Sequence, residues 1–146
     1  MRRFLLGLLL APAVVSSGTI KHFDLLATFE APKAQGGQGA VVVTFRPHDP
    51  DLRLNETPAP RLKLDLTESV LLDRQAPAPR SAPAYDPLTA KYLDFAEPVR
   101  FPVAIAPTAP AGDHSVEAKV VFFYCSIREA WCRRGTSRVD LTVRVP

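Results

Sequence analysis

Prolines divide this chain into short segments that have the composition of β-strands. The 146 residues include 15 prolines, and a proline can neither continue a helix nor donate to a strand ladder. Between the prolines lie β-branched runs and runs in which apolar and polar residues alternate with a period of two, which predict strands. We expect extended segments at 20–30, 40–46, 52–55, 61–66, 69–73, 99–105, 114–124 and 136–145.

No segment shows a convincing helical period, although 88–95 fits either a short helical turn or a strand. Seven to nine short strands separated by turn signals predict an all-β protein, an antiparallel β-sandwich of immunoglobulin-like architecture. The likeness concerns architecture alone, because the widely spaced cysteines and intervening tryptophan of antibody domains are missing. Four prolines make 75–87 a loop, and Pro102 predicts that its strand lies at a sheet edge or bulge.

The N-terminus has the layout of a secretory signal peptide. Two arginines precede an apolar run at 4–15, and small residues follow. We expect a signal at 1–17, cleavage after Ser17 and one domain at 18–146; a retained anchor is the alternative. The apolar run is shorter than the ~20 residues that span a bilayer, so the cleaved protein should not be an integral membrane protein. We expect a periplasmic or other extracytoplasmic location, where a disulfide persists.

The charge and histidine content narrow the function further. Without the two signal arginines the chain has 16 basic and 15 acidic residues, which gives no basis for nucleic-acid binding. Histidines occur only at His22, His48 and His114, with no recognisable ligand spacing. We therefore expect no cofactor and no zinc, although a transient copper–thiolate site remains an alternative. We also expect a monomer. The carboxylates of Asp49 and Asp51 fit turn chemistry.

Cys125 and Cys132 are the only cysteines, and the strands expected at 114–124 and 136–145 enclose them. Facing residues of an antiparallel hairpin have Cα atoms about 4.5 Å apart, and a disulfide accepts about 4.4–6.8 Å. The hairpin therefore predicts a disulfide. A bridge closing a loop of about eight residues stabilises by only about 2.5 kcal/mol, which modestly favours a redox role. The spacing alone supports a structural bridge equally well.

The neighbours of the cysteine pair carry charge and aromatic rings. Arginines at 128, 133 and 134 favour a thiolate. We expect Tyr124 to shield the pair, while Trp131 fits either packing or a docking surface. Asn55 begins an Asn-Glu-Thr glycosylation pattern, which often occurs by chance.

The segments 101–105, 110–125 and 131–136 resemble the amino-terminal periplasmic domain of the thiol:disulfide interchange protein DsbD. The shared order is a strand with Pro-Val, a turn, a long strand ending in Tyr beside the first cysteine, a tight loop, and an aromatic residue before the second cysteine. The resemblance covers about 88–145. It implies an immunoglobulin-like sandwich that relays reducing equivalents from a thioredoxin-like domain to exported oxidoreductases, as a component of a protein-disulfide reductase system.

Carried over residue by residue, the resemblance makes Cys125 and Cys132 the catalytic pair. We expect Cys125, first in the motif, to react with the partner and Cys132 to resolve the mixed disulfide. The loop at 85–88, from Tyr85 to Leu88, falls where the family has a cap, but its residues do not match. Six residues separate the cysteines, one more than in a well-known member of the family. The partners, thioredoxin-like or membrane redox proteins, would be separate chains. The alternative is a non-catalytic binding module with a structural disulfide.

Overall fold

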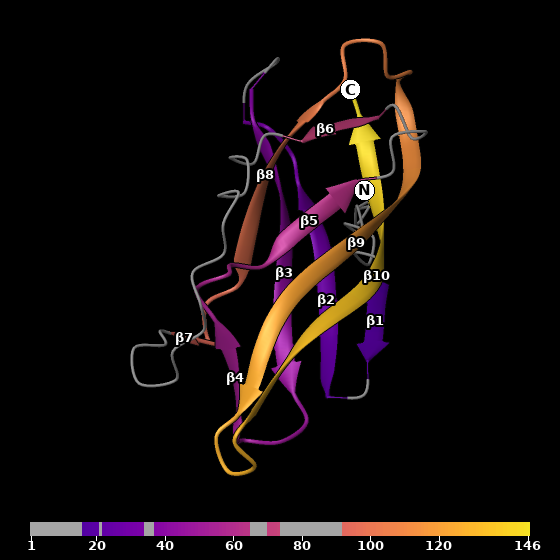
Figure 1. Ribbon diagram of the computed structural model, residues 1–146. Helices are drawn as coiled ribbons and strands as arrows, with labels where there is room; N and C mark the ends of the chain where they lie inside the picture. Colours follow the sequence, from indigo (N-terminus) through magenta and orange to yellow (C-terminus); the bar gives the residue numbers. More distant parts are fainter. Residues whose placement is uncertain (1–15, 21, 34–36, 65–69, 74–91) are drawn as a thin grey trace, which may run out of the picture.

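The computed structural model describes residues 16–20, 22–33, 37–64, 70–73 and 92–146, and the regular elements in these ranges are all β-strands (Figure 1). The strands form two antiparallel sheets. The all-β fold and the antiparallel sandwich of immunoglobulin-like architecture are therefore confirmed. None of the described segments is a helix long and apolar enough to cross a membrane.

Five strands form the first sheet, in the order β1-β2-β3-β8-β6. Their bounds are Ser16–Ile20 for β1, Phe23–Glu30 for β2, Gly39–Pro47 for β3, Val99–Ile105 for β8 and Leu71–Asp73 for β6. The second sheet has the order β10-β9-β4-β7, and β5 also pairs with β9. Here the bounds are Trp131–Val145 for β10, Gly112–Ser126 for β9, Leu52–Asn55 for β4, Tyr92–Leu93 for β7 and Arg61–Leu64 for β5.

The core lies between the sheets and is built from alternate residues of each strand. Aromatic rings form its centre: Phe23 of β2 meets Phe122 edge-on with ring centroids 5.5 Å apart, and Tyr124 at 5.1 Å. Valines and leucines fill the space around these rings. One consequence of this packing concerns Gly135 of β10, which faces Phe122 across the hairpin. A Cβ at position 135 would lie 2.5 Å from the Phe122 ring.

The structure changes three details of the expected strands. The segment at 20–30 forms two strands instead of one, because the chain turns at His22 and pairs β1 with β2. The segment at 69–73 contributes β6, which pairs with β8 in the first sheet. Pro102 lies in β8, which is not an edge strand, because β3 and β6 lie on either side of it. β6 pairs with β8 only from Val103 onward. Among the described residues, Pro102 is therefore paired on one side only, with β3.

Several expectations lie outside the described residues. They are residues 1–15 of the signal peptide expected at 1–17, the C-terminal part of the strand at 61–66, and the whole loop at 75–87. The candidate cap from Tyr85 to Leu88 is also among them. The expected cleavage after Ser17 would fall within β1.

The β9–β10 hairpin is the largest element, with 15 residues in each strand. In Figure 1 its two ribbons run together across the molecule, and its tip lies beside the turn between β3 and β4. This placement brings the cysteine pair and the acidic β3–β4 turn to the same end of the sandwich.

Candidate functional site

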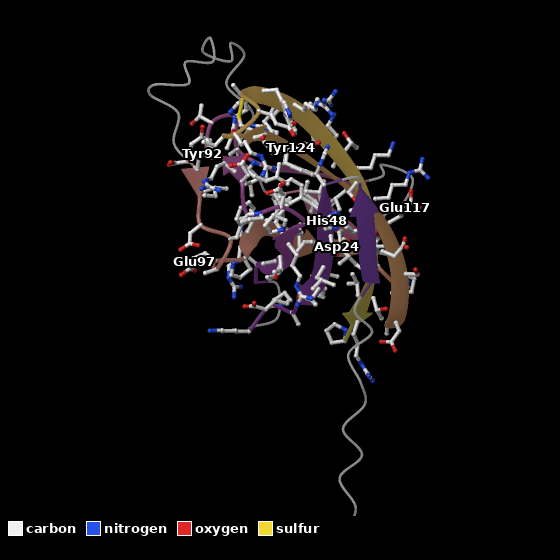
Figure 2. All side chains as sticks on the ribbon, turned by 90° about the horizontal axis from the view of Figure 1, so that it is seen from below. Asp24, His48, Tyr92, Glu97, Glu117 and Tyr124 are labelled. Carbon is white, nitrogen blue, oxygen red and sulfur yellow. A yellow bond between two sulfur atoms is a disulfide. The ribbon has the colours of Figure 1, made fainter. Side chains whose placement is uncertain are left out.

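Cys125 of β9 and Cys132 of β10 face each other in register and form a disulfide, with their Cα atoms 4.0 Å apart. One more pair of residues follows before the turn at 127–130, where Ala130 has a φ of 54°. Figure 2 shows the bond on the same side of the view as Tyr92, which lines a hollow together with both cysteines. The predicted bond at the mouth of the hairpin is confirmed.

The two cysteines differ sharply in exposure. Cys125 is 2% exposed, whereas Cys132 is an exposed residue. The sheet order gives the reason: β9 has β10 on one side and β4 on the other, while β10 ends the second sheet. A molecule approaching from solvent therefore meets Cys132 first.

A hollow of about 390 Å³ opens beside the disulfide. Apolar side chains surround it, including Ile127 at the hairpin tip, which is 51% exposed. The residues that line the hollow are Tyr92, Cys125, Ser126, Ile127, Ala130, Trp131 and Cys132. This opening can admit a side chain of a partner protein to the rim of the disulfide.

An amide lies against the buried sulfur. Sγ of Cys125 is 3.2 Å from Oδ1 of Asn55, and Asn55 is itself only 2% exposed. Both residues lie in the second sheet, on neighbouring strands. The same burial bears on the glycosylation pattern at this position, because a buried amide cannot carry a glycan on the folded protein.

Two acidic residues of the β3–β4 turn hold the hairpin tip. Oδ2 of Asp51 accepts hydrogen bonds from the Ser126 hydroxyl at 3.0 Å and the Arg128 backbone N–H at 2.6 Å. The backbone N–H of Ile127 donates to the Asp51 carbonyl at 3.1 Å. Asp49 adds an ion pair to the Arg128 guanidinium at 2.7 Å. Sequence reasoning assigned these carboxylates to turn chemistry alone and missed their part in positioning the hairpin.

The turn also explains the ionisation of Asp49. A hydrogen bond from the backbone N–H of Asp51 has the largest effect on the Asp49 carboxyl and lowers its pKa below the usual 3.8. Desolvation opposes this effect, and the positive charge of Arg128 adds to it. The charge of Arg128 is thus engaged by two carboxylates at the tip. It contributes less to stabilising a thiolate than the sequence suggested.

Tyr124 does not shield the disulfide. Adjacent residues of a strand point to opposite faces of the sheet, so the side chains of Tyr124 and Cys125 lie on opposite faces. The Tyr124 side chain faces the core, where its ring packs on Phe23. Burial raises the pKa of Tyr124 above 10.0, with Arg133 opposing. The aromatic side chain that borders the cysteines on the outer face is Tyr92, which no pattern in the sequence indicated.

Trp131 combines packing with exposure. Its ring lies 5.7 Å from Tyr124 and 5.4 Å from His22. Its indole N–H donates to Glu129 at 2.6 Å, and the Arg133 guanidinium lies 4.3 Å from the ring centroid. The side chain therefore closes the core at its edge and also forms one wall of the hollow.

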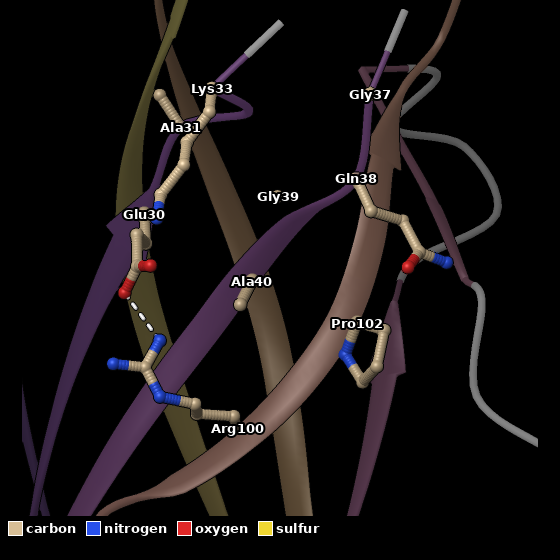
Figure 3. Close-up of a pocket in the computed structure, with 9 residues that line it drawn as sticks. All are labelled: Glu30, Ala31, Lys33, Gly37, Gln38, Gly39, Ala40, Arg100 and Pro102. Atoms are coloured by element: carbon tan, nitrogen blue, oxygen red, sulfur yellow. Dashed lines mark hydrogen bonds and ion pairs between the residues drawn. The ribbon is translucent and has the colours of Figure 1, made fainter.

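A second hollow, of about 450 Å³, lies at the opposite end of the sandwich, where β2 ends and β3 begins (Figure 3). Its two facing charges, Arg100 and Glu30, form an ion pair with each other. Among the described residues, no three His, Cys, Asp or Glu side chains lie together in a way that could hold a metal ion.

No protein-family model, curated protein or solved structure matches this chain. The functional argument therefore depends on the disulfide and its surroundings.

Proposed function

We propose that this chain is an exported thiol–disulfide exchange module. It relays reducing equivalents through Cys125 and Cys132, to or from thioredoxin-like or membrane redox partners in the periplasm or another extracytoplasmic compartment. The observation that carries this proposal is the position of the disulfide, at a hairpin tip with Cys132 exposed beside an open hollow. The signal-like N-terminus and the resemblance of the cysteine hairpin to the DsbD domain support it.

Exposure assigns different roles to the two sulfurs. Disulfide exchange begins when a thiolate attacks one sulfur and forms a mixed disulfide. The exposed Cys132 is the sulfur that a partner can reach, so Cys125 is the leaving group. This assignment reverses the order inferred from the motif.

The full exchange is balanced in two steps. The partner thiolate bonds to Sγ of Cys132, the original S–S bond breaks, and its electron pair goes to Cys125, which is then protonated by water. A second partner thiolate attacks the partner sulfur of the mixed disulfide and releases Cys132 as a thiolate. The partner dithiol becomes a disulfide, and the hairpin disulfide becomes a dithiol.

Trapping tests both the function and the order. With Cys125→Ser, the lone Cys132 is first converted to a mixed disulfide with thionitrobenzoate. The thiolate of a thioredoxin-like protein that lacks its own resolving cysteine should then displace thionitrobenzoate from Cys132 and leave a stable protein–protein mixed disulfide. The matched variant, Cys132→Ser, leaves only the buried thiol and should trap much less. Absence of a mixed disulfide with both variants would contradict the proposal. Trapping only by Cys132→Ser would contradict the assigned order.

A second candidate function is a non-catalytic binding module with a structural disulfide. The burial of Cys125 and the acidic turn that holds the hairpin favour it. A structural bridge resists reduction, with a potential below about −300 mV, whereas exchanging bridges have higher potentials. The reduction potential therefore separates the two functions.

A further inference from the structure

Asn55 is a buried amide placed against one sulfur of the disulfide. It ends β4, and the preceding residue in that strand, Leu54, pairs with Tyr124, the residue before Cys125. Alternation puts Arg53, Asn55 and Cys125 on the outer face of the second sheet, away from the core leucines. On this face Oδ1 of Asn55 lies 3.2 Å from Sγ of Cys125.

This contact changes its chemical nature with the redox state. In the disulfide, Sγ carries no proton and cannot donate to Oδ1. After reduction, Cys125 is a thiol, and its S–H is a donor within reach of the same oxygen. We propose that Asn55 is a positioning residue that favours the dithiol, by accepting a hydrogen bond that forms only when the Cys125–Cys132 bond is broken.

The hydrogen bond between Cys125 and Asn55 affects the redox equilibrium because both groups are buried. Asn55 and Cys125 are each 2% exposed, so water is a poor substitute for the missing partner. A buried acceptor that gains a donor recovers part of its desolvation cost. The gain applies to the reduced form only and therefore shifts the redox equilibrium. An amide with a merely structural role would stabilise both forms equally.

This inference rests on the proposed function, in which the bond is made and broken, and it identifies a residue that sets how readily this happens. Exchange follows the balanced steps given above. The electron pair of the S–S bond moves to Cys125, water supplies the proton, and the resulting S–H donates to Asn55. Asn55 itself forms no covalent bond.

The test is the redox equilibrium of the full chain with reduced and oxidised glutathione, for the wild type and Asn55→Leu. Leucine has a similar volume but no acceptor, so its equilibrium should shift toward the disulfide by about threefold to tenfold. At about 30 mV per tenfold change, the potential falls by about 15–30 mV. Asn55→Asp keeps an acceptor oxygen, so its redox equilibrium should lie closer to that of the wild type.

Ser137→Ala is the matched control, because Ser137 is also a buried polar residue of the second sheet and lies far along β10 from the cysteines. Its equilibrium should equal that of the wild type. Urea unfolding of oxidised and reduced protein gives an independent measure: Asn55→Leu should destabilise the reduced form more than the oxidised form. If Asn55→Leu does not fold, Asn55→Ala provides the same comparison.

An unchanged glutathione equilibrium in the Asn55 variants, or equal destabilisation of both forms, would overturn the inference. So would a shift of the same size in Ser137→Ala. These results do not depend on a protein partner. A wild type that forms no mixed disulfides but still shows the Asn55 shift would refute the proposed function alone.

Discussion

The Ser126 hydroxyl donates to the Asp51 carboxylate across 3.0 Å, and this bond joins the end of β9 to the β3–β4 turn. Ser126 is the residue directly after Cys125, so the bond fixes the backbone next to the buried sulfur. The disulfide is thus held from two sides, by β4 along the strand and by the acidic turn at the tip.

Removal of the Asp51 side chain should loosen the hairpin tip. Asp51→Ala leaves the nearly buried Ser126 hydroxyl and the Arg128 N–H without their acceptor. We expect a loss of about 1–3 kcal/mol in the free energy of unfolding of the oxidised protein, measured by urea denaturation. Asp113→Ala is the control, because it removes only an exposed ion pair at 3.9 Å and should cost less than ~0.5 kcal/mol. Equal costs would show that the turn does not hold the hairpin.

Asp49 predicts an acid-sensitive contribution to stability. Its pKa in the folded protein is lowered, chiefly by the Asp51 N–H and then by Arg128, from the usual 3.8. A lowered folded-state pKa gives stability that is present above 3.8 and is lost as the pH falls through the lower value. Asp49→Asn should therefore lose less stability than the wild type over that fall in pH. Parallel curves of unfolding midpoint against pH for the two proteins would contradict this explanation.

Tyr124 predicts the opposite dependence at high pH. Burial raises its folded-state pKa above 10.0, so its contribution to stability is present below 10.0 and is lost as the pH rises through the higher folded value. Tyr124→Phe cannot ionise and should keep more of its stability in alkali. Denaturation midpoints of both proteins below and above pH 10 measure the difference. The same alkaline loss in both would assign it to other groups.

Gly135 should tolerate no larger side chain. A Cβ at this position would lie 2.5 Å from the ring of Phe122, which is fully buried. We expect Gly135→Ala to cost about 1–3 kcal/mol through overpacking. Thr136→Ala, at the adjacent exposed position, is the control and should cost less than ~0.5 kcal/mol. A stable Gly135→Ala protein would show that the ring is displaced easily.

The sequence predicted the elements with strong local signals. Alternation at 136–145 and the apolar run ending at Tyr124 gave the hairpin, and the hairpin gave the disulfide. The turn at His22 was missed because neither proline nor glycine marks it. Pairing between distant strands leaves no local pattern, so Asn55 and Tyr92 could not be placed beside the cysteines in advance.

The different exposure of the two cysteines also could not be predicted from the sequence. It depends on which strand is flanked on both sides, a property of sheet order and not of neighbouring residues. The motif order therefore pointed to Cys125, whereas the fold leaves Cys132 accessible. Local patterns predicted the disulfide, and the sheet order determines which of its two sulfurs is exposed.

The reduction potential of the Cys125–Cys132 pair tests the proposed function most directly. It can be measured on the full chain by equilibration with glutathione buffers and alkylation of the free thiols. A disulfide that exchanges with partners at its exposed sulfur should give a value above about −300 mV. A value well below that limit would mean that the bond is a structural bridge and that the chain carries no electrons.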